Sequence, residues 1–179
     1  EGPRFGSPDR YVNAIMSNIL GGGMSSRLFR KVREERGLCY SIYSYLSSHS
    51  DTGLFGIYTA TGKETEKQAI ELIVDVIAGF LDKGITESEL DRAREQSKAN
   101  VLLALESTIS RMNNLARGEL FVGEILQPEE IIARYDAVDR ESVLGAARKI
   151  LDLERVSLSA VGRVDQADSY MDLIKKTMR

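Results

Sequence analysis

We expect an α+β domain from this sequence, with an antiparallel sheet packed against helices. Apolar residues recur every three or four positions along most of the chain, as in amphipathic helices. In residues 38–61 the period changes to two, with a turn-rich interruption between two such runs, which is typical of a hairpin. The predicted order is helix, helix, strand, strand, four helices, strand, helix, and this order indicates an α+β fold. Residues 1–179 are interpreted as a single domain, because the length is ordinary for one core.

The composition excludes several classes of partner. The net charge is −3, so neither a nucleic-acid surface nor an anionic membrane surface is expected. No apolar run approaches the roughly 20 residues that a membrane helix needs. A single cysteine, Cys39, excludes an internal disulfide framework and suits a reducing compartment, which favours the cytoplasm. The chain begins at Glu1 without an initiator methionine, so we interpret it as a piece of a longer protein.

The first half of the chain gives clear element boundaries. Asp9 is a good N-cap for a helix that ends at Gly21. Residues 38–48 and 54–61 form the two predicted strands, joined by a turn that contains His49. The next helix begins near Glu64 and is closed by Gly84. Its buried stripe is predicted to comprise Ala69, Ile70, Ile73, Val74, Ile77, Phe80 and Leu81.

The second half is predicted to be mainly helical. Thr86 and Glu89 form a capping box at the start of a long helix over residues 87–117, with a bend expected near Ser107, where hydroxyls compete for backbone bonds. A connector over 118–127 precedes a short helix beginning at Pro128 and a helix capped by Asp139. A last strand over 156–162 and a terminal helix over 165–178 complete the chain. The long helix is expected to turn inward Leu90, Ser97, Val101, Leu102, Leu105, Ile109, Met112 and Leu115.

One stretch, residues 21–51, combines a glycine turn, a short helix, a glycine stop and a strand. Ser25 or Ser26 is expected to cap the helix, and Gly37 to end it in the left-handed conformation. Arg33 ends the helix and Tyr40 begins the strand, so the sharp turn between them can bring both side chains toward one spot. Alternation along the strand predicts one face made of Tyr40, Ile42, Ser44 and Leu46, and the opposite face of Cys39, Ser41, Tyr43 and Tyr45.

This stretch carries a family resemblance. Its letters are GGGMSSRLFRKVREERGLCYSIYS, and they resemble the signature of the C-terminal, non-zinc half of insulinase/pitrilysin-type metallopeptidases, the family of mitochondrial processing peptidase and its bacterial relatives. The resemblance implies a metallopeptidase-half fold whose N-terminal strand is largely missing from this chain. It also implies that Arg33 and Tyr40 act on substrate across the interface with a zinc-bearing half. Zinc, its histidines and a water-activating glutamate would then lie in that other half.

Several other residues suggest sites, and most of them have simpler structural interpretations. Residues 21–23 lack the lysine of a phosphate loop, so Gly21, Gly22 and Gly23 are interpreted as a mobile or closely packed turn that contributes to substrate binding. A metal site in this chain is not predicted, because zinc needs several ligands and the only histidine, His49, lies in a turn. Cys39 has no neighbouring histidine and is interpreted as a buried thiol. The hairpin tyrosines are a candidate surface for an extended peptide: Tyr43, Tyr45 and Tyr58.

Two functions stay open at this point. By resemblance, the chain is the substrate-binding C-terminal half of a zinc metalloendopeptidase that hydrolyses peptides in a chamber between two similar halves, with Arg33 and Tyr40 as catalytic and substrate-binding residues. The alternative is a non-catalytic arginine/tyrosine partner subunit or a structural relative of the same fold. The implied partners are a peptide and a zinc-bearing half or paired subunit, and a homodimer is possible. An unrelated α+β binding module would instead have no paired half.

Overall fold

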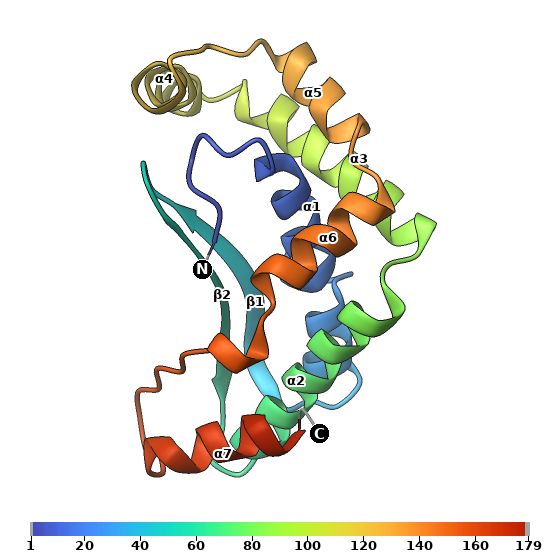
Figure 1. The fold of residues 1–179 in the computed structure, drawn as a ribbon, viewed down its shortest axis with the longest axis vertical. Helices are drawn as coiled ribbons and strands as arrows, with labels where there is room; N and C mark the ends of the chain where they lie inside the picture. Colours follow the sequence, from blue (N-terminus) through green and yellow to red (C-terminus); the bar gives the residue numbers. More distant parts are fainter. Residues whose placement is uncertain (1, 178–179) are drawn as a thin grey trace.

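Helix α1 (Arg10–Gly21) lies at the centre of the computed structural model, which describes residues 2–177 (Figure 1). It packs against strand β1 (Cys39–Ser48) and against helices α3 (Glu87–Ala104), α5 (Pro128–Asp136) and α6 (Arg140–Ile150). The hairpin therefore covers one side of α1 and the helices cover another. The remaining elements are η1 (Phe29–Glu34), β2 (Gly53–Thr61), α2 (Glu66–Lys83), α4 (Thr108–Arg117), η2 (Gly118–Val122), η3 (Leu153–Arg155) and α7 (Ala167–Thr177).

The predicted hairpin is confirmed, with β1 and β2 paired antiparallel. Its inner face contacts α1 through a pair of buried serines: the Ser44 hydroxyl donates to the Ser17 carbonyl at 2.8 Å, and the two hydroxyl oxygens lie 3.0 Å apart. Gly21 allows this approach. A Cβ at that position would lie 2.4 Å from the backbone nitrogen of Ser44, so only glycine fits without moving the strand.

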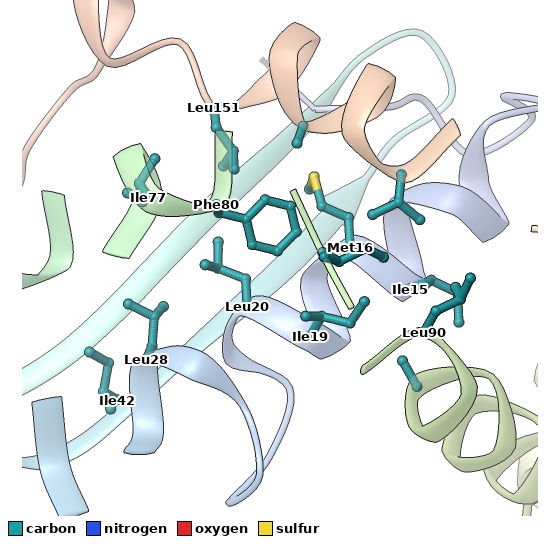
Figure 2. Packing of buried hydrophobic residues seen from close by; sticks show 14 of the residues in the cluster. Ile15, Met16, Ile19, Leu20, Leu28, Ile42, Ile77, Phe80, Leu90 and Leu151 are labelled. Carbon is teal, nitrogen blue, oxygen red and sulfur yellow. The ribbon is translucent and has the colours of Figure 1, made fainter. Parts of the chain in front are cut away.

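The hydrophobic core lies between α1, the hairpin, α2, α3 and α6 (Figure 2). Phe80 of α2 and Met16 of α1 are completely buried at its centre. Burial of large side chains from separate elements supplies most of the stability of such a fold. Its fully buried large side chains are Phe80, Ile15, Met16, Leu20, Leu28, Leu90, Val32 and Val143.

A polar contact fixes the start of α3. Arg27 donates from Nε and Nη2 to the two carboxylate oxygens of Glu89, at 2.7 and 2.8 Å, and from Nη2 to the carbonyl of Gly84 at 2.8 Å. Its guanidinium also lies 4.8 Å from the centre of the Phe80 ring. Burial alone would raise the pKa of Glu89, but the hydrogen bonds from Arg27 and from the Thr86 backbone lower the pKa to about 2.

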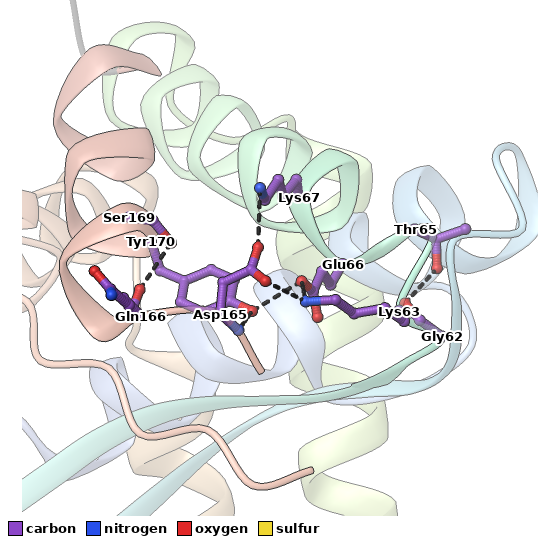
Figure 3. A network of polar contacts seen from close by, with 9 residues as sticks. All are labelled: Gly62, Lys63, Thr65, Glu66, Lys67, Asp165, Gln166, Ser169 and Tyr170. Carbon is purple, nitrogen blue, oxygen red and sulfur yellow. Dashed lines mark hydrogen bonds and ion pairs between the residues drawn. The ribbon is translucent and has the colours of Figure 1, made fainter. Parts of the chain in front are cut away.

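A second polar network attaches α7 to α2 (Figure 3). Lys63 contacts Glu66 at 2.8 Å and Asp165 at 2.7 Å, and Lys67 contacts the same aspartate at 3.0 Å. The Tyr170 hydroxyl donates to Glu66 at 2.8 Å. The hydrogen bonds that Lys63 donates to the carboxylates of Asp165 and Glu66 raise the pKa of Lys63, so its ammonium stays charged.

Several predicted helix ends are confirmed. Thr86 and Glu89 form the capping box, and the Asp139 carboxylate accepts a hydrogen bond from the Ser142 backbone at 2.7 Å. Pro128 takes the first position of α5. Gly37 and Gly84 have positive φ, as expected of residues that end a helix. Asp9 differs, because its side chain makes no capping bond.

The predicted long helix over 87–117 is two helices. After α3, Ser107 adopts an extended conformation and its hydroxyl accepts from the Ser110 backbone at 3.2 Å, so it caps α4. The expected bend at Ser107 is thus confirmed and is a complete break. The predicted connector also contains a helical turn, η2.

The predicted inward face of this region is wrong for Leu102 and for the apolar side chains of α4. For α4, the break at residues 105–107 redirects the chain, so the helical period no longer carries the same face to the core. Leu102 lies before the break, in the last turn of α3, and is also exposed. Neither α4 nor η2 contributes a buried residue. The side chains predicted inward but at least half exposed are Leu102, Ile109, Met112 and Leu115.

The predicted strand over 156–162 is also wrong. In the part of the chain that the structure describes, the sheet has only β1 and β2, and residues 156–162 form no strand. The alternation of Val156 and Leu158 with serines indicates only a local preference for extended backbone. A strand also requires a partner strand to hydrogen-bond with it. Val161 is fully exposed, so this segment has no buried face at its end. Met178, predicted in the terminal helix, lies outside the described residues.

Candidate functional site

Arg33 and Tyr40 lie side by side on the surface. The guanidinium carbon of Arg33 is 5.8 Å from the centre of the Tyr40 ring and 4.9 Å from the centre of the Phe29 ring. Both residues are exposed, and the Tyr40 side chain is 83% accessible. A cationic donor and a hydroxyl donor are therefore presented together to solvent, and the guanidinium contacts both aromatic rings.

A π-helical turn positions Arg33. Within Phe29–Glu34 the backbone widens, and the Glu35 N–H donates to the Arg30 carbonyl at 2.8 Å, five residues back. Leu28 and Val32 anchor the other side of this segment and are completely buried. The sequence predicted only an ordinary short helix here. π-Helical turns are frequent at functional sites, where the extra residue changes the direction of a side chain.

A β-bulge positions Tyr40. Cys39 pairs with Thr61 and Ser41 pairs with Ala60, so Tyr40 is an extra residue with no opposite partner. The predicted alternation placed Tyr40 on the same face as Ile42 and Ser44, and this prediction is wrong. The bulge reverses the phase of the strand at this point, so Tyr40 faces solvent whereas Ile42 is buried.

Cys39, the residue before Tyr40, lies on the buried side of the strand with Ile42. Its thiol is buried, as predicted. Burial raises the pKa of the Cys39 thiol, and the hydrogen bond with Thr59 and the charge of Arg33 offset this only in part. A protonated, buried thiol is a packing group rather than a nucleophile.

The glycine run makes close contacts within the chain. Gly21 lies against Ser44 of β1, and a Cβ at Gly23 would lie 3.6 Å from Nε2 of Gln96 on α3. The expected serine cap is not present at Ser26, because its hydroxyl donates to the Gly23 carbonyl at 2.6 Å. This bond closes the glycine turn instead. The contribution of Gly21, Gly22 and Gly23 to substrate binding stays a prediction.

The solvent face of the hairpin carries three tyrosines. Tyr43 and Tyr58 stand opposite each other in the register, and their rings stack at 5.1 Å between centroids with 28° between planes. The Tyr45 ring lies 6.1 Å from that of Tyr43. All three side chains are nearly half exposed. Because of the bulge, Tyr40 projects from the same side of β1 as Tyr43 and Tyr45.

The residues described do not form a metal site. Among residues 2–177 there is no group of three or more histidine, cysteine, aspartate or glutamate side chains that would hold a metal ion. His49 is exposed in the hairpin turn, 3.5 Å from the Ser47 hydroxyl. The donor set of a zinc site is thus not found in this part of the molecule. That the chain binds no zinc remains a prediction.

Phe29 is a site residue that the sequence reasoning did not assign. It precedes Arg33 by four residues, the spacing at which side chains on one helical face meet. This spacing could have predicted the contact between the two side chains. The bulge at Tyr40 has no such local signal. It depends on the register of pairing with β2, which residues 38–48 alone do not specify.

The hairpin, the π-helical turn and the surrounding helices define the class: an α+β domain that exposes an arginine–tyrosine pair. Residues 1–97 match the family model described as the peptidase M16 inactive domain. The chain belongs to this family.

Known relatives agree with this assignment. The chain is 42% identical over 150 residues to an uncharacterized zinc protease of Bacillus subtilis, covering 84% of this chain and 37% of the relative. The crystal structure of a peptidase M16 inactive domain from Pseudomonas fluorescens superposes with a TM-score of 0.77 and 28% identity, over 84% of this chain and 36% of that one. A chain of Complex III2 from Candida albicans shares the fold, with a TM-score of 0.73 and 23% identity, over 83% of this chain and 37% of that one.

The matched segment is short relative to these proteins. The chain spans little more than a third of the length of the curated zinc protease and of the Pseudomonas fluorescens chain. Within residues 2–177, no helix has the length and apolar character required to cross a membrane.

Proposed function

We propose that this chain is the substrate-binding, C-terminal half of a two-domain zinc metallopeptidase that hydrolyses peptides in a chamber between two similar halves. Family membership and the zinc-protease names of the relatives support the class of enzyme. The observation that carries the proposal for this half is the exposed pair of Arg33 and Tyr40. Residues 1–179 form one domain in this proposal, and the zinc-bearing half or a paired subunit is its partner.

The two side chains have complementary roles. Arg33 offers a planar fork of donors that suits a peptide carbonyl or a terminal carboxylate. The Tyr40 hydroxyl donates to the peptide oxygen that becomes negative as water attacks the carbonyl carbon. Zinc bound by the other half would supply the activated water. Phe29 holds the Arg33 guanidinium beside Tyr40, so both donors reach one peptide group.

Replacing Tyr40 by phenylalanine in the full-length protein tests this role. We expect a fall in kcat of about 10-fold or more with little change in KM, because the hydroxyl contact strengthens in the transition state. Steady-state kinetics with a peptide substrate measure both constants. Tyr170→Phe is the matched control: it removes a hydroxyl bonded to Glu66 on α2, and kcat should not change. An unchanged kcat in Tyr40→Phe removes Tyr40 from the mechanism.

The second candidate is a non-catalytic partner or structural relative. Two observations support this candidate: the fold is shared with a chain of Complex III2, and the family is described as an inactive domain. The sequence preceding residue 1 separates the two functions. An H-x-x-E-H motif there supports the peptidase, and a degraded motif supports a partner subunit.

We also propose a compartment and an assembly state for the full-length protein. The lone buried cysteine suits the cytoplasm. A homodimer of the full-length protein is a further proposal, which sedimentation at several concentrations tests directly.

A further inference from the structure

The solvent face of the hairpin continues the Arg33–Tyr40 surface as a row of aromatic rings. Tyr40, Tyr43 and Tyr45 project from the same side of β1, and Tyr58 of β2 stacks on Tyr43. A strand rises about 3.3 Å per residue, so Tyr43 lies about 10 Å along β1 from Tyr40. An extended peptide covers the same distance in about three residues.

The packing of the rings fixes their orientation. Gly56 stands opposite Tyr45 in the register, and a Cβ at Gly56 would lie 2.4 Å from Cζ of the Tyr45 ring. The Tyr45 ring therefore lies over the glycine backbone, across β2. Tyr43 and Tyr58 are held by stacking on each other. Beneath them, Ile42 and Ser44 pack on the core. Preorganised rings lose little conformational entropy on binding.

We infer that Tyr43, Tyr45 and Tyr58, named here the tyrosine platform, bind an aromatic or large apolar side chain of the peptide whose backbone Arg33 holds. This inference rests on the proposed function and adds a substrate class to it. The preferred substrates are extended peptides with such a side chain about three residues from the group bound at Arg33. Edge-to-face or offset stacking on the platform supplies the preference.

A single-stranded nucleic acid is the competing occupant, because bases also stack on tyrosines. The chain has a net charge of −3, and no basic residue belongs to the platform itself, so a polyanion is disfavoured. A peptide carbonyl or carboxylate matches the positive charge that Arg33 places at the end of the row.

Fluorescence tests the platform directly, because the chain contains no tryptophan. The probes are a short peptide, blocked at its N-terminus, with one tryptophan three residues before a free C-terminal carboxylate, and the same peptide with alanine in place of the tryptophan and a dye at the N-terminus. We expect the tryptophan peptide to bind the intact chain more tightly than the alanine peptide. Tyr43→Thr should weaken only the tryptophan peptide, by roughly 2- to 10-fold, which is the range for one aromatic pair. Threonine retains the strand preference.

Three further variants complete the test. Tyr58→Thr should act like Tyr43→Thr. Met112→Ala, an exposed apolar position on α4, is the matched control and should leave both peptides unaffected. Arg33→Ala should weaken both peptides, since it removes the charge rather than the stacking.

Several results would overturn the inference. These are equal binding of the two peptides, no binding of the tryptophan peptide at millimolar concentration, or tighter binding of a single-stranded oligonucleotide. A fourth result would also overturn the inference: Tyr43→Thr weakens binding of the tryptophan peptide, but Arg33→Ala has no effect on either peptide. The tyrosine platform and Arg33 would then not bind the same peptide. None of these outcomes decides the role of Tyr40, which depends on kcat in the full-length protein.

Discussion

The hairpin and the α4–η2 segment both expose large apolar side chains, but different structures lie beneath them. Under the hairpin, Ile42 and Ser44 are buried against α1, and Leu28 and Val32 anchor the adjoining turn. In contrast, α4 and η2 contribute no buried residue. Leu120 of η2 is 78% exposed.

This difference shows where a surface can serve as a defined site. The positions of Arg33, Tyr40 and the tyrosine platform are set by a packed core, so a ligand meets them in one arrangement. The contacts of α4 are mainly with η2, its neighbour along the chain. In η2, the Phe121 ring lies 5.2 Å from the Phe5 ring between centroids. We therefore place the binding surface on the hairpin.

The largest expected effect is a difference in how much a side chain of the core and a side chain of α4 contribute to the free energy of unfolding. Phe80→Ala should lower the free energy of unfolding by about 3–5 kcal/mol, because it removes a completely buried ring from the core. Met112→Ala on α4 should change it by less than about 0.5 kcal/mol. Chemical denaturation followed by circular dichroism measures both. Similar losses in the two variants would contradict the contrast between the regions.

The Arg27–Glu89 pair should make the stability of the fold depend on pH. The pKa of Glu89 falls from an ordinary value of 4.5 to about 2 in the folded chain. A lowered pKa means that its stabilisation, about 3 kcal/mol at most, is fully present above pH 4.5 and is lost as the pH falls toward 2. Denaturation at pH 7 and pH 3 should show this loss in the native chain.

The control for this pH dependence is Glu89→Gln, which removes the titrating carboxylate. The variant should be less stable at pH 7 and should lose less stability on acidification than the native chain. An equal acid loss in both proteins would assign the pH dependence to other carboxylates.

Two glycine variants should change stability in opposite directions. Gly21→Ala places a Cβ against the backbone of Ser44 and should cost about 1–3 kcal/mol, as overpacking does. Gly79→Ala, inside α2, meets no atom within 4 Å and should stabilise by about 0.5–1 kcal/mol. Thermal unfolding compares the two. A tolerated Gly21→Ala would mean that α1 and β1 are not in the close contact described.

The sequence predicted the parts of the fold that depend on local chemistry. The hairpin, the stops at Gly37 and Gly84, and the caps at Thr86 and Asp139 each follow from a few neighbouring residues. The exposed face of α4 and the missing strand over 156–162 do not, because burial and strand pairing depend on distant partners. The same distinction holds at the site. The turn at Gly37 predicted that Arg33 and Tyr40 approach each other, but the bulge that turns Tyr40 outward depends on its pairing with β2.

A double-mutant cycle of Arg33→Ala and Tyr40→Phe on kcat/KM in the full-length protein measures most directly whether the two side chains act on one peptide group. We predict a coupling energy of about 1 kcal/mol or more, because the guanidinium lies beside the Tyr40 ring and both donors face the same ligand. Effects that add within about 0.3 kcal/mol would show that the two residues act independently and would contradict the shared site.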